Sequence, residues 1–370
     1  MISTDKNVFE EKSEVRQRMI EYGRLVDELH VIVFTKQQSQ ISNLKSKNFG
    51  NVFLYPTNSQ NRLFYIFDAV KISKKIKNID LITTQDPFET GLAGWRLARK
   101  FSLPLQIQVH TDFLSPYFKK ESFLNKLRVY LAKFLIKRAS CVRVVSERIK
   151  KSLVANACLL ARRGYTLYPI VVLPVFVDVE KIKNAPIKTD LRKKYSQFDF
   201  IILMASRFSK EKNISLAIDA MAEVVKHYPM AGLLIIGDGP QHEALKLQIT
   251  NYKLQKNIVL ENWTNDLSSY YKTADLFLLT SNYEGYGRTL IEAASVGCKI
   301  ISSDVGVADE ILPEENIFEP GNKEQLKEKI IKAIKGEIKM SNTQCLTKMP
   351  TKEQYLQAYK KSWENCEFVE

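Results

Sequence analysis

The sequence lacks long apolar runs and closely spaced cysteines. No apolar stretch approaches the roughly 20 residues that a membrane-spanning helix needs, and the first residues contain no apolar secretion signal. The cysteines form no Cys-x-x-Cys pair, so the pattern indicates neither a zinc site nor a disulfide framework. The five cysteines are Cys141, Cys158, Cys298, Cys345 and Cys366. A reducing, cytoplasmic compartment fits this pattern best.

Motifs of several enzyme classes are also missing. No Asp-x-Asp occurs, which removes the usual carboxylate pair for a magnesium ion bound to a nucleotide. The chain has neither a Walker A loop nor a Gly-x-Ser-x-Gly elbow, which argues against P-loop hydrolases and serine esterases. We therefore expect no metal, and we expect bound phosphate to be neutralised by basic side chains and backbone N–H groups.

The composition is that of a globular protein, with 45% hydrophobic and 26% charged residues, and 370 residues suggest two domains. Residues 1–200 hold 35 basic and 18 acidic side chains, a net charge of +17, whereas residues 201–370 hold 20 and 23, a net charge of −3. This asymmetry favours two domains with different partners. Nucleic acid, an anionic membrane surface, an acidic substrate or a generally lysine-rich composition would each account for the basic half.

Strand-like runs alternate with helical stretches along most of the chain. We expect strands at residues 29–35, 52–55, 79–83, 105–109, 141–145, 170–174, 200–205, 232–237, 258–261, 276–280, 299–302 and 316–318. We expect helices at 11–26, 64–76, 90–100, 121–137, 215–227, 241–249 and 290–296. Continuous Ile, Val and Leu runs indicate strands buried on both faces, and the alternation predicts an α/β fold with parallel, doubly wound sheets.

The ends of the domains are less regular. We place the first domain at residues 1–175 and the second at 176–352, and we expect a last helix within 353–370 that packs back on the first domain. A doubly wound domain opens with a buried central strand of about 5–6 residues. Only Met1–Ser3 precede polar residues here, so we suspect that residues upstream are missing.

The strongest candidate site runs from Glu284 to Glu292, Glu-Gly-Tyr-Gly-Arg-Thr-Leu-Ile-Glu, after an apolar strand. A Gly-rich turn that leads into a helix N-terminus favours phosphate, because free N–H groups and the helix dipole both attract anions. Glu284 would accept hydrogen bonds from sugar hydroxyls, and Glu292 would hold a ribose. The alternative is a helix cap with two solvated carboxylates.

Two further loops follow predicted strands of the second half. Arg207-Phe-Ser-Lys-Glu-Lys212 places two cations five residues apart, where they would clamp two phosphates. Gly237-Asp238-Gly239 opens the next turn and is weak evidence by itself. Three such loops in one half indicate a bound nucleotide.

The first half offers a histidine and a basic helix. His110 is the only one of four histidines that follows a predicted first-half strand, although a lone histidine is more often structural. In residues 119–138, Phe123, Leu127, Tyr130 and Phe134 form one stripe and several lysines another. Such a helix would lie on an anionic membrane, or it would be an ordinary core-facing helix with a solvated lysine face.

Together these motifs resemble glycosyltransferase family 4, the retaining sugar-nucleotide transferases of GT-B architecture, over nearly the whole chain. The Glu284-x7-Glu292 pattern matches the family signature, Arg207 and Lys212 match its diphosphate clamp, and His110 matches its acceptor-domain histidine. The resemblance implies donor-binding roles for Gly237, Asp238, Gly239, Asn262, Trp263, Gly285, Tyr286, Gly287, Arg288, Thr289, Leu290 and Glu292. It implies catalytic roles for Glu284, His110, Arg207 and Lys212.

The resemblance also implies two Rossmann-like domains that face each other across a cleft, with the donor on the second domain and the acceptor on the first. It implies transfer of a hexose from a UDP- or GDP-sugar to a glycan or lipid-linked acceptor, with no further cofactor. Many relatives act at the inner membrane face in polysaccharide or glycolipid assembly, so we expect a cytoplasmic protein that attaches peripherally through residues 119–138. The departing phosphate is thought to take the acceptor proton.

The sequence departs from the family pattern at two places, and three other functions compete with the transferase interpretation. The first loop has Thr4–Phe9 where many members have Gly-Gly, and Val305-Gly306-Val307 stands where Gly-Gly is common. A sugar-nucleotide epimerase or hydrolase would share the shape but need no acceptor. A nucleic-acid-binding protein would fit the basic charge, yet no such motif appears, so we expect no nucleic-acid partner. A non-catalytic sugar-nucleotide sensor is the third rival.

Overall fold

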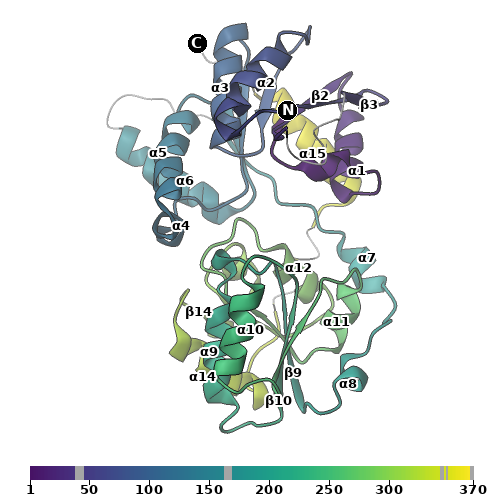
Figure 1. The fold of residues 1–370 in the computed structure, drawn as a ribbon, viewed down its shortest axis with the longest axis vertical. Helices are drawn as coiled ribbons and strands as arrows, with labels where there is room; N and C mark the ends of the chain where they lie inside the picture. The colour runs from purple at the N-terminus through teal and green to yellow at the C-terminus, as the bar shows by residue number, and fades with distance from the viewer. Residues whose placement is uncertain (38–45, 162–168, 342–345, 347–348, 367–370) are drawn as a thin grey trace. The chain divides into compact units, whose positions relative to one another are not determined.

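The computed structural model describes residues 1–37, 46–161, 169–341, 346 and 349–366. The chain divides into two compact units (Figure 1). Unit 1 contains residues 1–114, 122–174 and 351–370, and unit 2 contains residues 115–121 and 175–350. Each unit has its own sheet and its own core, and each is considered by itself.

Unit 1 contains an eight-stranded sheet in the order β3-β4-β2-β1-β5-β6-β7-β8. Its strands are β1 (Ile2–Ser3), β2 (Leu29–Val33), β3 (Lys47–Phe49), β4 (Val52–Pro56), β5 (Ile82–Thr84), β6 (Leu105–Val109), β7 (Cys141–Val144) and β8 (Ile170–Val172). All pairs are parallel except β3 with β4. The strand order reverses between β1 and β5, which makes this sheet doubly wound.

The helices of unit 1 cover both faces of that sheet. They are η1 (Lys6–Phe9), α1 (Glu14–Gly23), η2 (Arg62–Phe64), α2 (Tyr65–Ser73), α3 (Glu89–Phe101), α5 (Phe123–Ile136), α6 (Glu147–Ala161) and α15 (Lys352–Glu364). Helix α3 packs on β1, β5 and β6 and also contacts α2 and α5. Gly94 permits this close approach, because a Cβ there would lie 2.3 Å from the Thr84 side chain.

Unit 2 contains a six-stranded, fully parallel sheet in the order β11-β10-β9-β12-β13-β14. Its strands are β9 (Phe200–Ala205), β10 (Ala231–Ile236), β11 (Ile258–Glu261), β12 (Leu276–Leu279), β13 (Ile300–Ser303) and β14 (Ile317–Phe318). This is the order of a dinucleotide-binding fold, and it reverses between β9 and β12. Ligands of such sheets bind beyond the carboxyl ends of the strands at this reversal.

The helices of unit 2 again occupy both faces. They are α4 (Pro116–Glu121), α7 (Val179–Asn184), α8 (Leu191–Lys194), η3 (Lys210–Lys212), α9 (Ile214–Val224), α10 (His242–Asn251), α11 (Leu267–Thr273), α12 (Arg288–Ser295), α13 (Ala308–Ile311), η4 (Glu314–Asn316) and α14 (Lys323–Ile334). Helix α9 contacts α10 and α14, while α11 contacts α12 (Figure 1). The apolar faces of α9, α10 and α14 and the strands they cover form one buried core.

The strand expectations hold with small shifts at the ends. The ranges 105–109, 200–205 and 258–261 match β6, β9 and β11, whereas β5 begins at Ile82 rather than at residue 79. The short strand β1 pairs with both β2 and β5, so Ile2 and Ser3 occupy the centre of the sheet. Two strands were not expected from the sequence, β1 because it is so short and β3 because Lys-Asn-Phe is polar.

The expected helix over 121–137 is interrupted at Ser122. This residue is extended, with φ −157° and ψ 159°, and its side chain accepts a hydrogen bond from the backbone N–H of Asn125. Helix α4 therefore ends at Glu121 and α5 begins at Phe123. By its contacts α4 belongs to unit 2, while α5 belongs to unit 1. The single basic helix over 119–138 is thus wrong, because a capping serine divides it.

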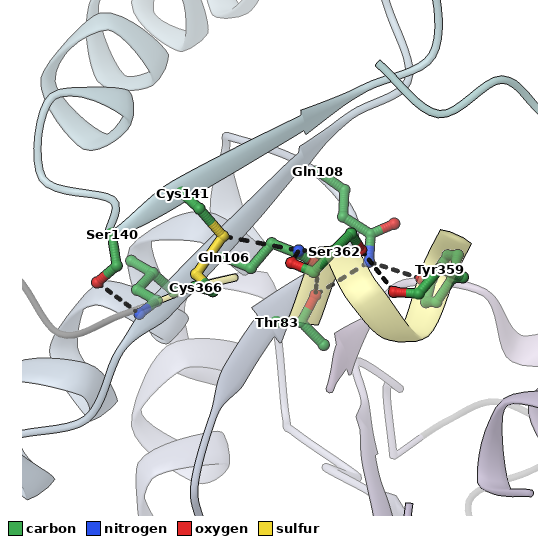
Figure 2. Close-up of a disulfide and its surroundings, with 9 residues drawn as sticks. Thr83, Gln106, Gln108, Ser140, Cys141, Tyr359, Ser362 and Cys366 are labelled. Atoms are coloured by element: carbon green, nitrogen blue, oxygen red, sulfur yellow. Dashed lines mark hydrogen bonds between the residues drawn. A yellow bond between two sulfur atoms is a disulfide. The ribbon is translucent and has the colours of Figure 1, made fainter. Parts of the chain in front are cut away.

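Helix α15 packs within unit 1 through polar contacts to β6, and Cys366, two residues beyond its end, forms a disulfide with Cys141 of β7 (Figure 2). Thr351 and Gln354 form a capping box at its start. Cys141 and Cys366 are bonded although 225 residues separate them, so the expectation of no disulfide is wrong for this pair. Spacing in the sequence gave no sign of it because folding brings the two cysteines together. Cys298 is buried and free, and Cys345 lies outside the described residues.

Candidate functional site

The strand reversal in unit 2 brings Lys212 and Glu284 together. Lys212 closes the turn after β9, and Glu284 lies in the loop after β12. The Lys212 Nζ atom is 2.5 Å from Glu284 Oε1, and the side chains are 21% and 13% exposed. The hydroxyl of Ser281 donates to the same carboxylate oxygen at 2.8 Å. A half-buried cation and anion therefore face each other where the fold places ligands.

Hydrogen bonds hold the two loops in register. The Thr280 hydroxyl donates to the backbone carbonyls of Lys212 and Asn213 at 2.9 and 3.0 Å. The backbone N–H of Asn282 donates to the Glu211 carbonyl at 2.7 Å. Asn213 adopts a left-handed conformation with φ +46° as the chain enters α9. The position of Lys212 therefore depends on both loops.

Arg207 lies beside this pair but is far more exposed. Its side chain is 71% exposed, and its Nη2 atom is 3.0 Å from Glu211 Oε1. Burial would raise the pKa of Glu211, but hydrogen bonds from Ser209 and Arg207 outweigh it and lower that pKa. Glu211 is therefore ionised at neutral pH. It holds Arg207 near Lys212, where the sequence predicted a diphosphate clamp.

Glu292 is nearly buried on α12, and its two oxygens have different partners. Oε1 is 2.7 Å from Arg288 Nε, one turn earlier in the helix. Oε2 accepts a hydrogen bond from the Tyr271 hydroxyl at 3.0 Å. Burial and the adjacent carboxylate raise the pKa of Tyr271 well above its usual value, so Tyr271 remains a donor. The alternative of a solvated cap carboxylate does not fit Glu292, which is only 8% exposed.

The loop after β10 approaches the loop after β9 through two glycines. Gly237 has φ +151° and Gly239 φ +156°, and a Cβ on Gly237 would lie 1.9 Å from the Ser206 carbonyl oxygen. The backbone N–H of Phe208 donates to the Asp238 carbonyl at 2.8 Å. The Gly-Asp-Gly sequence is weak evidence as a motif, but its geometry requires glycine.

Replacing Gly237 by alanine is expected to lower the free energy of unfolding by about 2 kcal/mol more than replacing Gly336, since it adds a backbone clash. Gly336 also has positive φ, +79°, but nothing lies within 4 Å of its added Cβ. The Gly336→Ala variant therefore measures only the cost of holding alanine at a positive φ. Urea denaturation of both variants measures the difference. Equal losses would mean that the loop relaxes without cost and that Gly237 is not required there.

The other predicted donor residues surround these loops. Asn262 and Trp263 follow β11, and both are exposed, Trp263 by 54%. Gly287 precedes α12 with φ +88°. The predicted residues Gly285, Tyr286, Thr289 and Leu290 are buried or half-buried. Unit 2 thus collects all the predicted residues except His110.

The sequence interpretation missed four residues that touch this site. Ser281 and Tyr271 contact the two glutamates, and Glu211 contacts Arg207. Tyr283, the neighbour of Glu284, packs edge-on against Phe118 of α4 at 5.5 Å and donates to Glu121. Three of them had a signal in the sequence, because Ser281 and Tyr283 lie within three residues of Glu284 and Glu211 lies between Arg207 and Lys212; Tyr271 comes from a separate element, α11.

His110 lies in unit 1, directly after β6, and is exposed. Its Nε2 atom is 3.0 Å from the side-chain oxygen of Gln108. Desolvation and the positive charges of Arg143 and Arg18 lower the pKa of His110 to about 3. Water around His110 and around Arg18, which is 43% exposed, weakens these effects, but every one of them lowers the pKa. His110 is therefore neutral at pH 7.

Helix α5 has an apolar outer face as well as an apolar core face. Its inner residues are buried against unit 1, Val129, Ala132, Leu135 and Ile136 among them. The outer face consists of Phe123, Leu124, Leu127, Tyr130 and Phe134, which are 73%, 46%, 51%, 66% and 39% exposed. The alternative that this stripe faces the core is therefore wrong. Residues 123–138 also hold five basic side chains and no acidic one.

Two family models match the chain in adjoining stretches. One is described as "Glycosyltransferase Family 4" and matches residues 23–181, and the other as "Glycosyl transferases group 1" and matches residues 188–345. The chain belongs to glycosyltransferase family 4. The two stretches follow the chain's division into two sheets, with the site around Glu284 inside the second.

Curated relatives and solved structures agree with this family. The chain is 28% identical to "Alpha-monoglucosyldiacylglycerol synthase" of Streptococcus pneumoniae over 63% of this chain and 54% of that protein. It is 27% identical to "UDP-Gal:alpha-D-GlcNAc-diphosphoundecaprenol alpha-1,3-galactosyltransferase" of Escherichia coli over 65% of this chain and 61% of that protein. The chain thus spans little more than half the length of these relatives. The structure of Anabaena Alr3699/HepE in complex with UDP is similar with a TM-score of 0.67 and 19% identity, over 98% of this chain and 94% of that one. This family 4 chain therefore has the GT-B fold.

No helix in the described part of the chain combines the length and apolar character of a membrane span. Among the same residues, no group of three or more His, Cys, Asp or Glu side chains is arranged to hold a metal ion.

Proposed function

We propose that this family 4 protein is a retaining glycosyltransferase that moves a hexose from a nucleoside-diphosphate sugar to a hydroxyl of a glycan or lipid-linked acceptor. The observation that carries the proposal is the Lys212–Glu284 pair at the strand reversal of unit 2. A cation and a hydrogen-bond acceptor 2.5 Å apart suit a substrate that joins a diphosphate to a sugar.

The reaction breaks the bond between the anomeric carbon and the diphosphate oxygen, and it forms a bond from that carbon to the acceptor oxygen. Lys212 and Arg207 stabilise the charge that develops on the leaving diphosphate. The N–H groups at the start of α12 add to this, because a helix N-terminus favours anions. The acceptor proton passes to an oxygen of the leaving phosphate. These side chains neutralise the diphosphate without a metal ion.

The two glutamates position the donor. Ser281 and Lys212 both contact Oε1 of Glu284, so its second oxygen is suited to accept a hydrogen bond from a sugar hydroxyl. Glu292, which Arg288 and Tyr271 hold in place, accepts hydrogen bonds from the ribose hydroxyls. The nucleotide named for the galactosyltransferase relative and for the HepE structure is UDP, which favours UDP over GDP as the donor nucleotide.

We further propose that the acceptor is lipid-linked and that the protein binds the cytoplasmic surface of an anionic membrane through the outer face of α5. The names of two relatives refer to a glycolipid and a lipid diphosphate. The exposed apolar stripe and the five basic residues of 123–138 suit insertion into such a surface. In a reducing compartment Cys141 and Cys366 would be neighbouring thiols.

Thermal melting with millimolar UDP, GDP and ADP tests the donor site. A nucleotide at about 100 times its dissociation constant adds about 2.7 kcal/mol of stability, so one nucleotide is expected to raise the melting temperature clearly. The shift should disappear in Glu292→Ala. It should persist, at reduced size, in Tyr271→Phe, which removes one partner of Glu292 but keeps the carboxylate and its contact with Arg288. If no nucleotide shifts the wild type, the transferase proposal fails.

Product analysis distinguishes the rival enzymes. An epimerase or hydrolase would release an altered or free sugar from the sugar nucleotide without an acceptor. The transferase is expected to consume sugar nucleotide only when membrane extract is present. Consumption at the same rate without extract would favour the rivals.

A further inference from the structure

Gln108 uses both ends of its amide in the interior of unit 1. It lies on β6 and is 2% exposed. Its nitrogen donates to the Thr83 hydroxyl at 3.0 Å and to the Tyr359 hydroxyl at 2.9 Å. Its oxygen accepts from Arg143 Nη1 at 2.8 Å and lies 3.0 Å from His110 Nε2. Figure 2 shows the Gln108 amide directed toward Tyr359 of α15.

These contacts determine which nitrogen of His110 carries the proton. A guanidinium only donates hydrogen bonds, so the Gln108 atom that faces Arg143 must be the oxygen. That same oxygen faces Nε2 of His110, so Nε2 must be the donor. In the neutral ring Nδ1 then carries the lone pair and is the acceptor that a substrate hydroxyl can use.

The C-terminal helix takes part in this arrangement. Arg143 lies on β7, and its Nη2 donates to the Tyr355 hydroxyl and to the Leu173 carbonyl, both at 3.2 Å. Its guanidinium also lies 4.5 Å from the centre of the Tyr359 ring. Both tyrosines belong to α15, so this helix anchors Gln108 directly and through Arg143. Because Arg143 is only 2% exposed, the residues around it hold its guanidinium in this orientation.

We propose that Gln108 is a positioning residue, held by Arg143 and by Tyr359 of α15, that keeps His110 in the Nε2–H form and presents Nδ1 to a substrate hydroxyl. The proposal rests on the transferase function for its kinetic consequence, but the state of the imidazole is measurable without activity. In this proposal α15 has a role in unit 1 beyond stabilising the fold.

Nuclear magnetic resonance of ¹⁵N-histidine-labelled protein tests the proton position. The chain has four histidines, and His110→Asn identifies the signals of His110. Wild-type protein is expected to show a neutral Nε2–H ring between pH 5 and 8. In Gln108→Glu a carboxylate faces Nε2, so His110 is expected to titrate at least about two pH units higher. Other charged or titratable groups here include Arg143 of β7, Arg18 and Tyr22 of α1, and Tyr355 and Tyr359 of α15; the two arginines oppose that rise.

Kinetics tests the positioning role, with a matched control on the same helix. Ser362 accepts from Gln106 much as Tyr359 accepts from Gln108, but it is connected to Gln108 only indirectly, through Gln106 and Thr83. Gln108→Leu is expected to lower kcat about tenfold and Tyr359→Phe by less, while Ser362→Ala leaves kcat unchanged. Gln108→Glu should lose activity as the pH falls through the raised pKa of His110, because a protonated Nδ1 no longer accepts.

Three results would overturn the proposal. They are an Nδ1–H ring in the wild type, an unchanged titration of His110 in Gln108→Glu, and a kcat for Gln108→Leu equal to that of Ser362→Ala. If even the wild type transfers no sugar, the proposed function fails, whereas the imidazole signals still decide the proton position.

Discussion

Replacing Lys212 by alanine is expected to lower turnover at least about 100-fold, the effect of losing one electrostatic donor at a developing anion. Lys212 is the less exposed of the two clamp cations, at 21% against 71% for Arg207, so its charge is screened less. Glu284→Ala is expected to have an effect of the same size, because the donor sugar loses its hydrogen-bond acceptor. Steady-state kinetics with the donor that the melting experiment identifies measures both effects on kcat.

The double variant and a distant ion pair separate chemistry from folding. Removing one partner leaves the other charge half-buried, so each single variant is expected to melt lower than the double variant Lys212→Ala/Glu284→Ala. Activity should not return in the double variant. Arg192→Ala is the control, because it breaks an ion pair with Asp275. Asp275 lies at the amino end of β12, whereas Glu284 follows the carboxyl end of the same strand. Near-normal turnover in Lys212→Ala would remove this lysine from the mechanism.

Replacing Phe123, Leu127 and Tyr130 by serine is expected to weaken binding to anionic lipid vesicles at least about 100-fold. Each of the three side chains is more than half exposed and would contribute about 1 kcal/mol or more by burial among lipid chains. Changing Lys126, Lys133 and Lys137 to glutamine should have a similar effect at low salt, at about 1 kcal/mol per charge. Vesicle sedimentation with anionic and neutral lipids measures both.

Exposed apolar residues elsewhere supply the control. Leu247 and Met230 of unit 2 are 61% and 46% exposed but belong to no such stripe. Serine at both positions is expected to leave vesicle binding unchanged. If the α5 variant binds vesicles as well as this control, the outer face of α5 is not a membrane surface. If the wild type binds neutral and anionic vesicles equally, the basic residues take no part.

The parts of the fold that follow from local pattern were predictable. Strands such as Phe200–Ala205 are uninterrupted apolar runs, and glycines mark the turns after two other strands, Gly237 after β10 and Gly287 after β12. The loops that carry Arg207, Glu284 and Gly237 were located because parallel strands bring their carboxyl ends to one edge. Ser122 shows where pattern reading failed. The helical periodicity continues across it, but one capping hydrogen bond ends one helix and starts another in a different unit.

The polar interior of unit 1 was overlooked for a different reason. Gln106 and Gln108 alternate with apolar residues, which is typical of a strand with one solvated face. Both are buried instead, because α15 covers that face and supplies their partners. The sequence showed the alternation but not which element would cover it.

By itself the sequence determined the α/β class, the two doubly wound sheets, the family and the strand ends that carry the site. Each follows from local spacing or from short motifs, in which the interacting residues are neighbours in the chain. Tertiary structure alone decided the Lys212–Glu284 pair, the Cys141–Cys366 bond, the outward direction of the α5 stripe and the contact between Arg143 and Gln108. These depend on contacts between residues far apart in the chain, which no local pattern specifies.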